Sequence, residues 1–311
     1  MTRVTAIGRY IPEGRFDNRS TREKFDLTDD FLSDKLGVLQ TARRAPDEET
    51  SDLCAAAFRD LAGRCGIEAG DIDAVILVTQ NPDGRGLPHT AAAVHAKIGA
   101  APGCAAFDVS QGCAGFVYGL SIAQGFLAAA GLRRAVLFTA DPYSKILDPD
   151  DRNTALLFGD AATATLVEAG DAGAGWRPHH FRFLSLSDRR DMLENRNGAL
   201  FMNGRGIFNF AATSVPAEID AVLDAAGLDA DAIDLFLVHQ GSKFIVDTLC
   251  KRMTLPPGKV PFEVQQYGNT VSSSIPLLLA DRLGEKGLDR MLLCGFGVGL
   301  SAATCILSRT H

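Results

Sequence analysis

The sequence predicts an α/β protein made of two similar halves. Short apolar runs with the length of buried strands alternate along the 311 residues with longer helix-like segments, which is the pattern of layered α/β folds. The order of these elements in the first half recurs in the second, although the residues themselves do not repeat. We therefore expect an N-terminal half at 1–170 and a C-terminal half at 171–311, joined by the GDAGAG segment at 170–175.

The first half is predicted to alternate strands and helices. The strands are expected at 4–7, 74–79, 105–109, 135–139 and 162–168, and the helices at 51–65, 90–98 and 116–130. Ser51 or Thr50 is expected to cap the first helix through its hydroxyl oxygen. The stretch 109–132 has no charged residue and is long enough to span a bilayer, but its Ser, Gln, Tyr and Gly residues favour a helix buried inside the protein.

The second half is predicted to follow the same order. Helices are expected at 211–226, 242–253 and 272–283, and strands at 235–238, 291–296 and 301–307. The first of these helices should end near Gly227, because glycine readily adopts the left-handed conformation that terminates helices. The composition shows no low-complexity tract or flexible linker between the halves.

Composition and charge exclude several classes of protein. The chain is 46% hydrophobic and 22% charged, as expected of a globular protein, and its formal net charge of −7 offers no basic excess for nucleic acid. The seven cysteines are odd in number and include no C-x-x-C pair, so we expect neither a metal site nor a disulfide framework. Reduced thiols and the lack of a secretory signal pattern predict a cytoplasmic protein without membrane attachment.

The segment FDVSQGCAGF at 107–116 is predicted to carry a cysteine nucleophile. A strand ends near 109, a glycine-containing turn follows, and a helix is expected to begin at about Cys113. The positive end of a helix lowers the pKa of a thiol and so favours the reactive thiolate. The backbone N–H of Cys113 could then bind the oxyanion of a thioester under attack. The alternative from this pattern alone is an inert, buried cysteine.

His239 and Asn269 are the predicted partners of Cys113. His239 lies in VHQGSK at 238–243, between a predicted strand and a helix, and Asn269 lies in YGNTVSSS at 267–274, just before a helix. Active-site residues gather at such element ends in layered α/β folds. Together the two side chains could donate hydrogen bonds to one carbonyl oxygen and stabilise an enolate. The alternatives are a structural histidine and an asparagine that serves only as a turn residue and helix cap.

These three segments together resemble the β-ketoacyl-acyl-carrier-protein synthase III family, and the likeness runs along nearly the whole chain. Further matching segments, in the family's order, are DPDDR at 148–152, LFGD at 157–160, MNGRGIF at 202–208 and GFGVGLS at 295–301. The resemblance implies the thiolase fold, a duplicated five-layered αβαβα arrangement that is usually a homodimer. It also implies an acyltransferase that uses coenzyme A thioesters as substrates and holds no tightly bound cofactor.

The resemblance further implies a ping-pong reaction, with acyl carrier protein as a candidate partner. Cys113 would take an acyl group from a coenzyme A thioester, and His239 and Asn269 would hold a malonyl thioester as it loses carbon dioxide. The resulting carbon nucleophile would attack the acyl-cysteine, whose carbonyl oxygen the backbone N–H groups of Cys113 and Val298 would bind. The glycine-rich segment at 295–299 precedes an alternating strand rather than a helix, so we do not expect it to bind a dinucleotide.

The family's coenzyme A-binding positions are matched only in part. The resemblance assigns Phe31, Lys35 and Arg152 to the adenine end, where the family usually has Trp and Arg in the first two places. Phe can still stack on a base, and Lys keeps the charge without the planar fork of Arg. Ser242, also assigned to the coenzyme A-binding surface, replaces an Asn that helps to position His239.

Other departures concern the acyl group and the carrier. Leu87 stands where the common bacterial enzyme has Phe at the far end of the acyl pocket, so a longer or branched acyl group is expected to fit. The segment 184–201 is shorter than usual and rich in charge, and should border the acyl or acceptor channel. Lys243, Lys251 and Arg252 are either a docking surface for an acidic carrier or an ordinary solvated helix face.

Other functions compete with malonyl condensation. The acyl-cysteine could instead pass its acyl group to an amine, a hydroxyl or a β-keto acid, or the chain could be a non-catalytic subunit, although retention of all three site residues argues against the latter. A degradative thiolase needs a second cysteine in the C-terminal loop, whereas Cys294 falls on a predicted strand. Hydroxymethylglutaryl-type synthesis needs a carboxylate base that Gln80 and Asn81 do not supply.

Overall fold

The computed structural model describes residues 1–170, 173–256 and 258–310. Within these residues nine strands form one hydrogen-bonded sheet, in the order β11-β12-β13-β8-β1-β7-β6-β4-β5. The first-half strands are β1 (Thr2–Tyr10), β4 (Ala74–Val78), β5 (Ala105–Val109), β6 (Arg134–Ala140) and β7 (Ala162–Ala169). The second-half strands are β8 (Gly175–Ser185), β11 (Leu235–Val238), β12 (Arg290–Gly297) and β13 (Ser301–Thr310).

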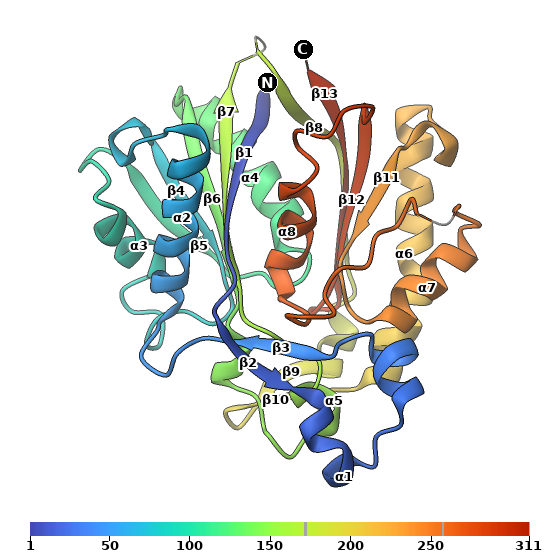
Figure 1. The fold of residues 1–311 in the computed structure, drawn as a ribbon. Helices are drawn as coiled ribbons and strands as arrows, with labels where there is room; N and C mark the ends of the chain where they lie inside the picture. The colour runs from blue at the N-terminus through green and yellow to red at the C-terminus, as the bar shows by residue number, and fades with distance from the viewer. Residues whose placement is uncertain (171–172, 257, 311) are drawn as a thin grey trace.

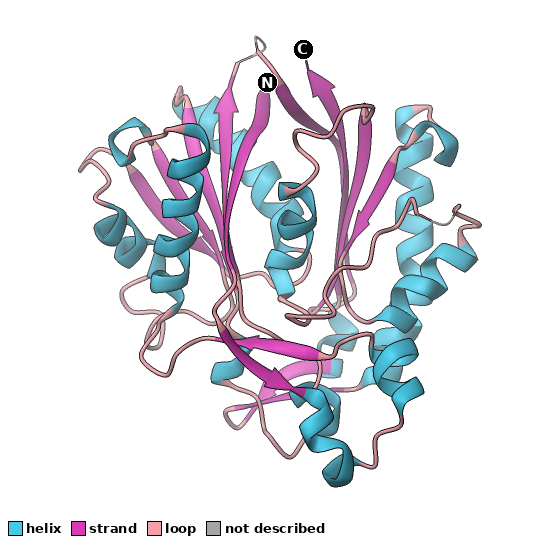
Figure 2. Cartoon of the chain, viewed as in Figure 1, coloured by secondary structure: helices cyan, strands magenta, loops and turns pink. Residues whose placement is uncertain are grey.

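The sheet divides into two wings, one from each half of the chain (Figure 1). The wings meet where β1 pairs with β8 at Val4 and Trp176, and they diverge away from that point. Helices α4 (Gly115–Ala130) and α8 (Ser274–Ala280) lie between the wings, as Figure 2 also shows. Helices α2 (Thr50–Cys65) and α3 (Thr90–Ile98) cover the outer face of the first wing, and α6 (Gly204–Ala226) and α7 (Lys243–Arg252) that of the second. The predicted five-layered αβαβα arrangement is therefore confirmed.

Apolar burial accounts for the order of the layers. One core cluster lies between the wings around α4 and α8, a second lies under α2 and α3, and a third lies under α6 and α7. Strand β4, with the sequence AVILV, is fully buried, as expected of a central parallel strand covered by helices on both faces. Helix α4 belongs to the cluster between the wings, which explains its lack of charged residues. No helix in the described part of the chain is long and apolar enough to span a membrane.

Several small elements gather at one end of the two wings (Figure 1). They are β2 (Gly14–Asp17), β3 (Gln40–Arg43), β9 (Leu193–Arg196), β10 (Ala199–Met202), α1 (Arg22–Phe25), α5 (Arg152–Ala155) and a π-helical turn at Phe31–Leu36. The sequence did not predict them. They matter for function because the π-helical turn and α5 carry Phe31, Lys35 and Arg152.

Some predicted element ends are wrong. Helix α2 is capped by Glu49, which forms a reciprocal capping box with Asp52, rather than by Ser51 or Thr50. Helix α6 begins at Gly204 instead of 211, and the helix predicted at 272–283 is a short 3-10 turn followed by α8. The boundary between halves near 170 stays a prediction, and residues 171–172 of the predicted connector lie outside the described residues.

Candidate active site

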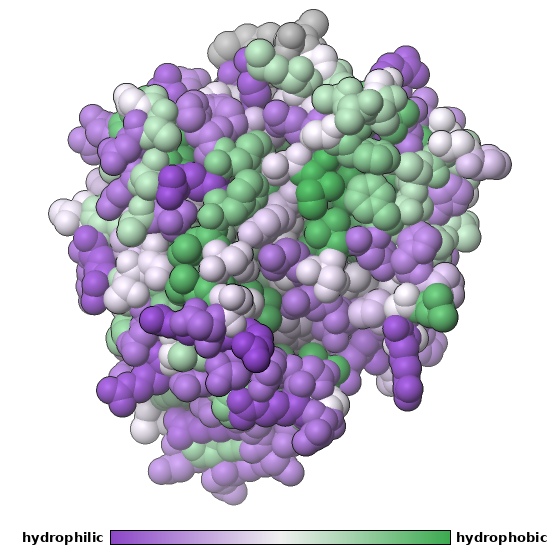
Figure 3. Space-filling model, turned by 180° about the vertical axis from the view of Figure 1, so that it is seen from behind, coloured by the Kyte–Doolittle hydropathy of each residue, from purple (hydrophilic) through white to green (hydrophobic). Residues whose placement is uncertain are grey.

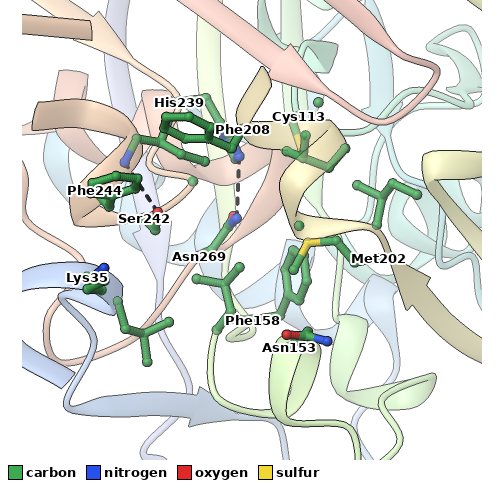
Figure 4. Close-up of a pocket in the computed structure, with 18 of the residues that line it drawn as sticks. Lys35, Cys113, Asn153, Phe158, Met202, Phe208, His239, Ser242, Phe244 and Asn269 are labelled. Atoms are coloured by element: carbon green, nitrogen blue, oxygen red, sulfur yellow. Dashed lines mark hydrogen bonds between the residues drawn. The ribbon is translucent and has the colours of Figure 1, made fainter. Parts of the chain in front are cut away.

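Cys113, His239 and Asn269 line one pocket of about 200 Å³, although they come from distant parts of the chain (Figure 4). Cys113 lies between the end of β5 and the start of α4, His239 directly follows β11, and Asn269 precedes the turn into α8. Each of the three side chains is only 3% exposed. The first half of the chain thus supplies the thiol, and the second half supplies the imidazole and the carboxamide.

The glycines of the GFGVG segment make room for Cys113. A Cβ on Gly297 would lie 2.7 Å from the Cys113 sulfur, and one on Gly295 would lie 2.6 Å from the Cys113 carbonyl oxygen. The segment joins the antiparallel strands β12 and β13, so no helix follows it and it has no dinucleotide-binding geometry. Cys294 lies within β12, as predicted, and not in the loop.

The expectation of an acidic thiol is wrong for the resting site. Burial raises the pKa of Cys113 to about 12, while the backbone N–H groups of Val298 and of Cys113 itself act in the opposite direction. Helix α4 begins at Gly115, two residues beyond the cysteine, and desolvation outweighs any effect of its N-terminus. Two backbone donors nevertheless face the sulfur, which is the arrangement that an oxyanion at this position requires.

His239 is a neutral base in the resting site, because burial lowers its pKa to about 3. Its Nδ1 lies 2.7 Å from the Ser274 hydroxyl oxygen, and that hydroxyl donates to the Val271 carbonyl at 3.0 Å. Since the single hydroxyl hydrogen is used there, we assign the ring proton to Nδ1 and leave Nε2 as an acceptor. The edge of the Phe296 ring packs against the imidazole, with 5.5 Å between ring centroids.

Asn269 is held so that its amide nitrogen faces His239. Its Oδ1 accepts a hydrogen bond from the backbone N–H of Val271 at 2.9 Å, which leaves Nδ2 3.4 Å from His239 Nε2 (Figure 4). Its backbone N–H and C=O bond to Leu157 and Gly159, both at 2.9 Å. In this resting tautomer Asn269 is the donor of the pair, so the expectation that both side chains donate is met only by Asn269.

The residues assigned to coenzyme A line the same pocket. The guanidinium of Arg152 lies 4.4 Å from the centroid of the Phe31 ring, a cation–π pair. The ammonium nitrogen of Lys35 lies 5.4 Å from the centroid of the Phe244 ring, which is 44% exposed. Ser242 caps α7, because its hydroxyl oxygen accepts the N–H of Ile245 at 3.4 Å.

Leu87 is the predicted site residue that the structure does not bring to the pocket. It is 94% exposed, and within this chain it does not line the hollow around Cys113. Its assignment to the acyl pocket is therefore not met inside a single chain. The reason is that the loop after β4 carries it outward instead of back towards Cys113.

Sequence reasoning missed the partner of His239 and the apolar lining of the pocket. Ser274 lies in the quoted YGNTVSSS segment, where its spacing from Asn269 was the only available signal. The apolar lining is Leu36, Leu157, Phe158, Leu193, Met202, Ile207, Phe208, Ile245 and Phe296. These residues are dispersed along the chain and converge only in the fold. No cluster of three or more metal-ligating side chains occurs among the residues that the structure describes.

Comparison with known proteins agrees with this architecture. Residues 107–183 match the family model of 3-oxoacyl-[acyl-carrier-protein (ACP)] synthase III, and residues 223–309 match its C-terminal model. A β-ketoacyl-[acyl-carrier-protein] synthase III of Halalkalibacterium halodurans is 34% identical over 99% of this chain and 96% of its own. A 3-oxoacyl-(acyl-carrier-protein) synthase III crystal structure superposes with a TM-score of 0.92 at 32% identity, covering 99% of each chain. The 3-oxoacyl-(acyl-carrier protein) synthase of Burkholderia xenovorans LB400 gives 0.90 at 33% identity, covering 99% of this chain and 93% of its own.

The protein has the thiolase fold. Its layers superpose on those of a synthase III structure, and a cysteine, a histidine and an asparagine surround one pocket. Within that class, the chain belongs to the 3-oxoacyl-[acyl-carrier-protein] synthase III family.

Proposed function

We propose that the protein condenses an acyl-coenzyme A with a malonyl thioester, with loss of carbon dioxide, through an acyl group on Cys113. The observation that carries this proposal is that a single pocket joins the thiol, the basic nitrogen of His239 and the amide donor of Asn269. The names of the similar proteins, which are synthases acting on acyl carrier protein, support it.

In the first step Cys113 attacks the acyl carbonyl carbon of the coenzyme A thioester. Its proton passes to Nε2 of His239, which is the unprotonated ring nitrogen in this tautomer. The backbone N–H groups of Cys113 and Val298 bind the oxyanion. The bond from carbon to the coenzyme A sulfur then breaks, and that sulfur takes the proton from His239. Because the resting thiol is protonated, a neutral histidine is the partner that this step requires.

In the second step the malonyl thioester loses carbon dioxide and becomes an enolate. Asn269 Nδ2 donates a hydrogen bond to the thioester oxygen as negative charge develops on it. His239 becomes a second donor when its proton lies on Nε2, which requires the Ser274 hydroxyl to turn its hydrogen towards Nδ1. The enolate carbon attacks the acyl-cysteine, and the Cys113 sulfur leaves as a thiolate and takes up one proton from solvent, which balances the loss of carbon dioxide from a carboxylate.

Coenzyme A would enter past the small elements at the end of the wings. The Phe31 ring and the Arg152 guanidinium form a flat, cationic surface on which an adenine can stack, and Lys35 adds positive charge for a phosphate. For an acidic carrier, Lys251 and Arg252 supply exposed charge in the last turn of α7, whereas Lys243 is paired with Asp247 at 2.6 Å.

A second copy of the chain is the expected partner, in the cytoplasm. Strand β5 is at the edge of the nine-stranded sheet and has no neighbour on one side among the described residues. An unpaired edge readily accepts another strand. Leu87 is the most exposed large apolar side chain among the described residues, at 94%. All seven cysteines are free thiols in the described chain, which suits a reducing compartment.

The test is the intact mass of the protein after incubation with a panel of acyl-coenzyme A thioesters. We expect a mass gain equal to one acyl group, abolished in Cys113→Ala, and then carbon dioxide release on addition of malonyl-coenzyme A or malonyl carrier protein. Asn269→Ala should acylate normally and lose condensation, whereas His239→Ala should slow both steps by about 100-fold or more. Acylation without malonyl consumption would favour transfer to another acceptor, and no acylation by any donor would favour a non-catalytic subunit.

A further inference from the structure

The carboxylate of Asp141 joins two loops near the active site. Asp141 directly follows β6 and is 0% exposed. Its Oδ1 accepts the backbone N–H of Gln80 at 2.6 Å, and its Oδ2 accepts the hydroxyl of Ser272 at 2.5 Å. Gln80 lies in the loop after β4, whereas Ser272 lies in the turn between Asn269 and α8. One buried side chain of the first half thus binds the turn that carries Asn269.

The groups around Asp141 suit an ionised carboxylate. Burial raises the pKa of Asp141 to about 6, and hydrogen bonds from Gln80, Ser272 and Thr79 act in the opposite direction, so the group is charged at neutral pH. A carboxylate only accepts hydrogen bonds, whereas an asparagine would turn an N–H donor towards one of these donors. Because a buried charge is costly, we look for its role in the geometry that it maintains.

The backbone at Val271, immediately before Ser272, is strained. Its φ of +54° lies in the left-handed region, which a β-branched residue rarely adopts. Such a conformation persists only where the surrounding contacts hold it. It directs the Val271 N–H to Oδ1 of Asn269 at 2.9 Å, and this bond leaves Nδ2 of Asn269 facing His239. The bond from Ser272 to Asp141 begins at the next residue along the chain and is placed to hold this conformation.

Resting on the proposed condensation, we propose that Asp141 is a positioning residue for Asn269. By binding Ser272, it holds Val271 in the conformation that aims the Asn269 amide at the thioester oxygen of the malonyl group. Asp141 itself does not touch the reacting atoms and acts only through the turn.

The two half-reactions should depend on Asp141 to different extents. Asn269 acts only in the second step, whereas His239 acts in both. The backbone N–H of His239 bonds to the Cys294 carbonyl of the neighbouring strand at 2.9 Å, so the sheet supports the imidazole independently of the turn. The charge of Asp141 also raises the pKa of Cys113, so its removal does not hinder acylation. Loss of the contact to the turn should therefore slow condensation and spare acylation.

The experiment compares Asp141→Asn with Asp73→Asn in the full-length protein. Asp73 also accepts backbone N–H groups, from Arg133 and Arg134 at 2.8 and 2.9 Å, but at the opposite end of β6. Asp141→Asn should lower kcat for condensation with malonyl-coenzyme A by about tenfold or more, while KM and the rate of Cys113 acylation stay within about threefold. Asp73→Asn should change none of these. An unchanged kcat in Asp141→Asn, or an equal loss in Asp73→Asn, would overturn the proposal.

Ser272→Ala removes the same bond from the other side, and it serves alone if Asp141→Asn does not fold. It should also lower kcat for condensation with KM unchanged. The double variant of Asp141 and Ser272 should be no slower than the slower single variant, because both changes break one contact. Losses that multiply in the double variant would show that Asp141 does not act through Ser272.

A measurement by nuclear magnetic resonance separates this proposal from the proposed function. In protein labelled with isotopic asparagine, the side-chain amide signal of Asn269 is identified by its absence from Asn269→Ala. Asp141→Asn should shift or broaden this signal, and Asp73→Asn should leave it in place. An unmoved signal in Asp141→Asn would refute the positioning role. A protein that shows the shift but neither acylates nor condenses would refute only the proposed function.

Discussion

At the scale of single residues, opposing effects act on the thiol of Cys113. Burial raises its pKa, and the two backbone N–H groups that face the sulfur lower it by a smaller amount. The sequence pattern showed the turn and the helix but not the degree of burial, which depends on Gly295 and Gly297 bringing β12 against the cysteine. The identity of the nucleophile was thus predictable from sequence, whereas its protonation state was not.

Alkylation of the free protein follows from that pKa. Because the thiolate is the reactive form, Cys113 should react slowly while its pocket is empty, and the exposed Cys65 should react first. Peptide mapping after brief treatment with iodoacetamide at neutral pH measures the order. Labelling of Cys113 ahead of Cys65 would mean that the resting thiol is more acidic than burial implies.

Acid should destabilise the protein partly through His239. Its pKa of about 3 in the folded state lies below the ordinary value of 6.5, so its contribution to stability is full above pH 6.5 and declines as the pH falls towards 3. The unfolding free energy of the unaltered protein relative to His239→Gln should therefore drop by about 1–2 kcal/mol between pH 7.5 and pH 5.

Denaturant titrations of both proteins at the two pH values measure this difference. Asp141, whose pKa burial raises to about 6, changes stability in the opposite direction, but it does so in both proteins and cancels in the comparison. A difference that stays constant with pH would show that His239 can be protonated in the folded protein.

At the scale of elements, the continuous apolar runs were predictable and the mixed ones were not. Strand β4 is a run of five buried apolar residues, whereas β8 contains Pro178, His179 and His180 and reads as a loop. The start of α6 is hard to predict from sequence because Gly204 and Gly206 lie in its first turn. The Asn203 side chain nevertheless caps the helix by accepting the N–H of Gly206 at 3.0 Å. Short-range patterns identify elements buried on both faces better than those that are half exposed.

The site elements show the same limit. Cys113, His239 and Asn269 stand in distinctive segments and were predictable, but Ser274 gains its role only because α8 begins beside β11. Contacts between elements that are distant in sequence decide such roles.

The junction of β12 and β13 can be tested with a matched pair of glycines. Gly297→Ala would place a methyl group against the Cys113 sulfur, and we expect acylation to fall at least about 100-fold, because small displacements in an active site have large effects on rate. Gly284→Ala, where no atom lies within 4 Å of the new Cβ, should leave the rate unchanged. Acylation rates of the two variants are measured by intact mass. Near-normal activity of Gly297→Ala would show that the close approach of Gly297 to the Cys113 sulfur is not required.

At the scale of the whole molecule, the site lies at the end of the two wings where the small elements gather, away from the junction of β1 and β8. Helices α4 and α8 lie side by side between the wings, and Cys113 and Asn269 precede their N-terminal ends (Figure 1). Neither wing alone contains the thiol together with the imidazole. The surface seen from behind, in Figure 3, carries apolar patches among polar ones.

Association of two copies can be tested at Leu87. Leu87→Asp adds a charge to a side chain that contacts little in the single chain, so folding should be preserved while a dimer that buries this side chain is weakened. Phe244→Asp, at the pocket mouth, is the matched change at another exposed apolar residue. Light scattering coupled to size exclusion should report a dimer for the unaltered protein and Phe244→Asp, with a shift towards monomer for Leu87→Asp. A monomeric unaltered protein would refute the dimer.

The enclosed position of Cys113 has a consequence for the time between turnovers. Peroxide oxidises thiolates far faster than thiols, and a sulfur that keeps its proton until substrate arrives is a poor target. Oxidative damage should therefore begin at the exposed Cys65, where it leaves the active site intact. The same desolvation that makes the resting sulfur unreactive would preserve the protein through periods when acyl donors are scarce.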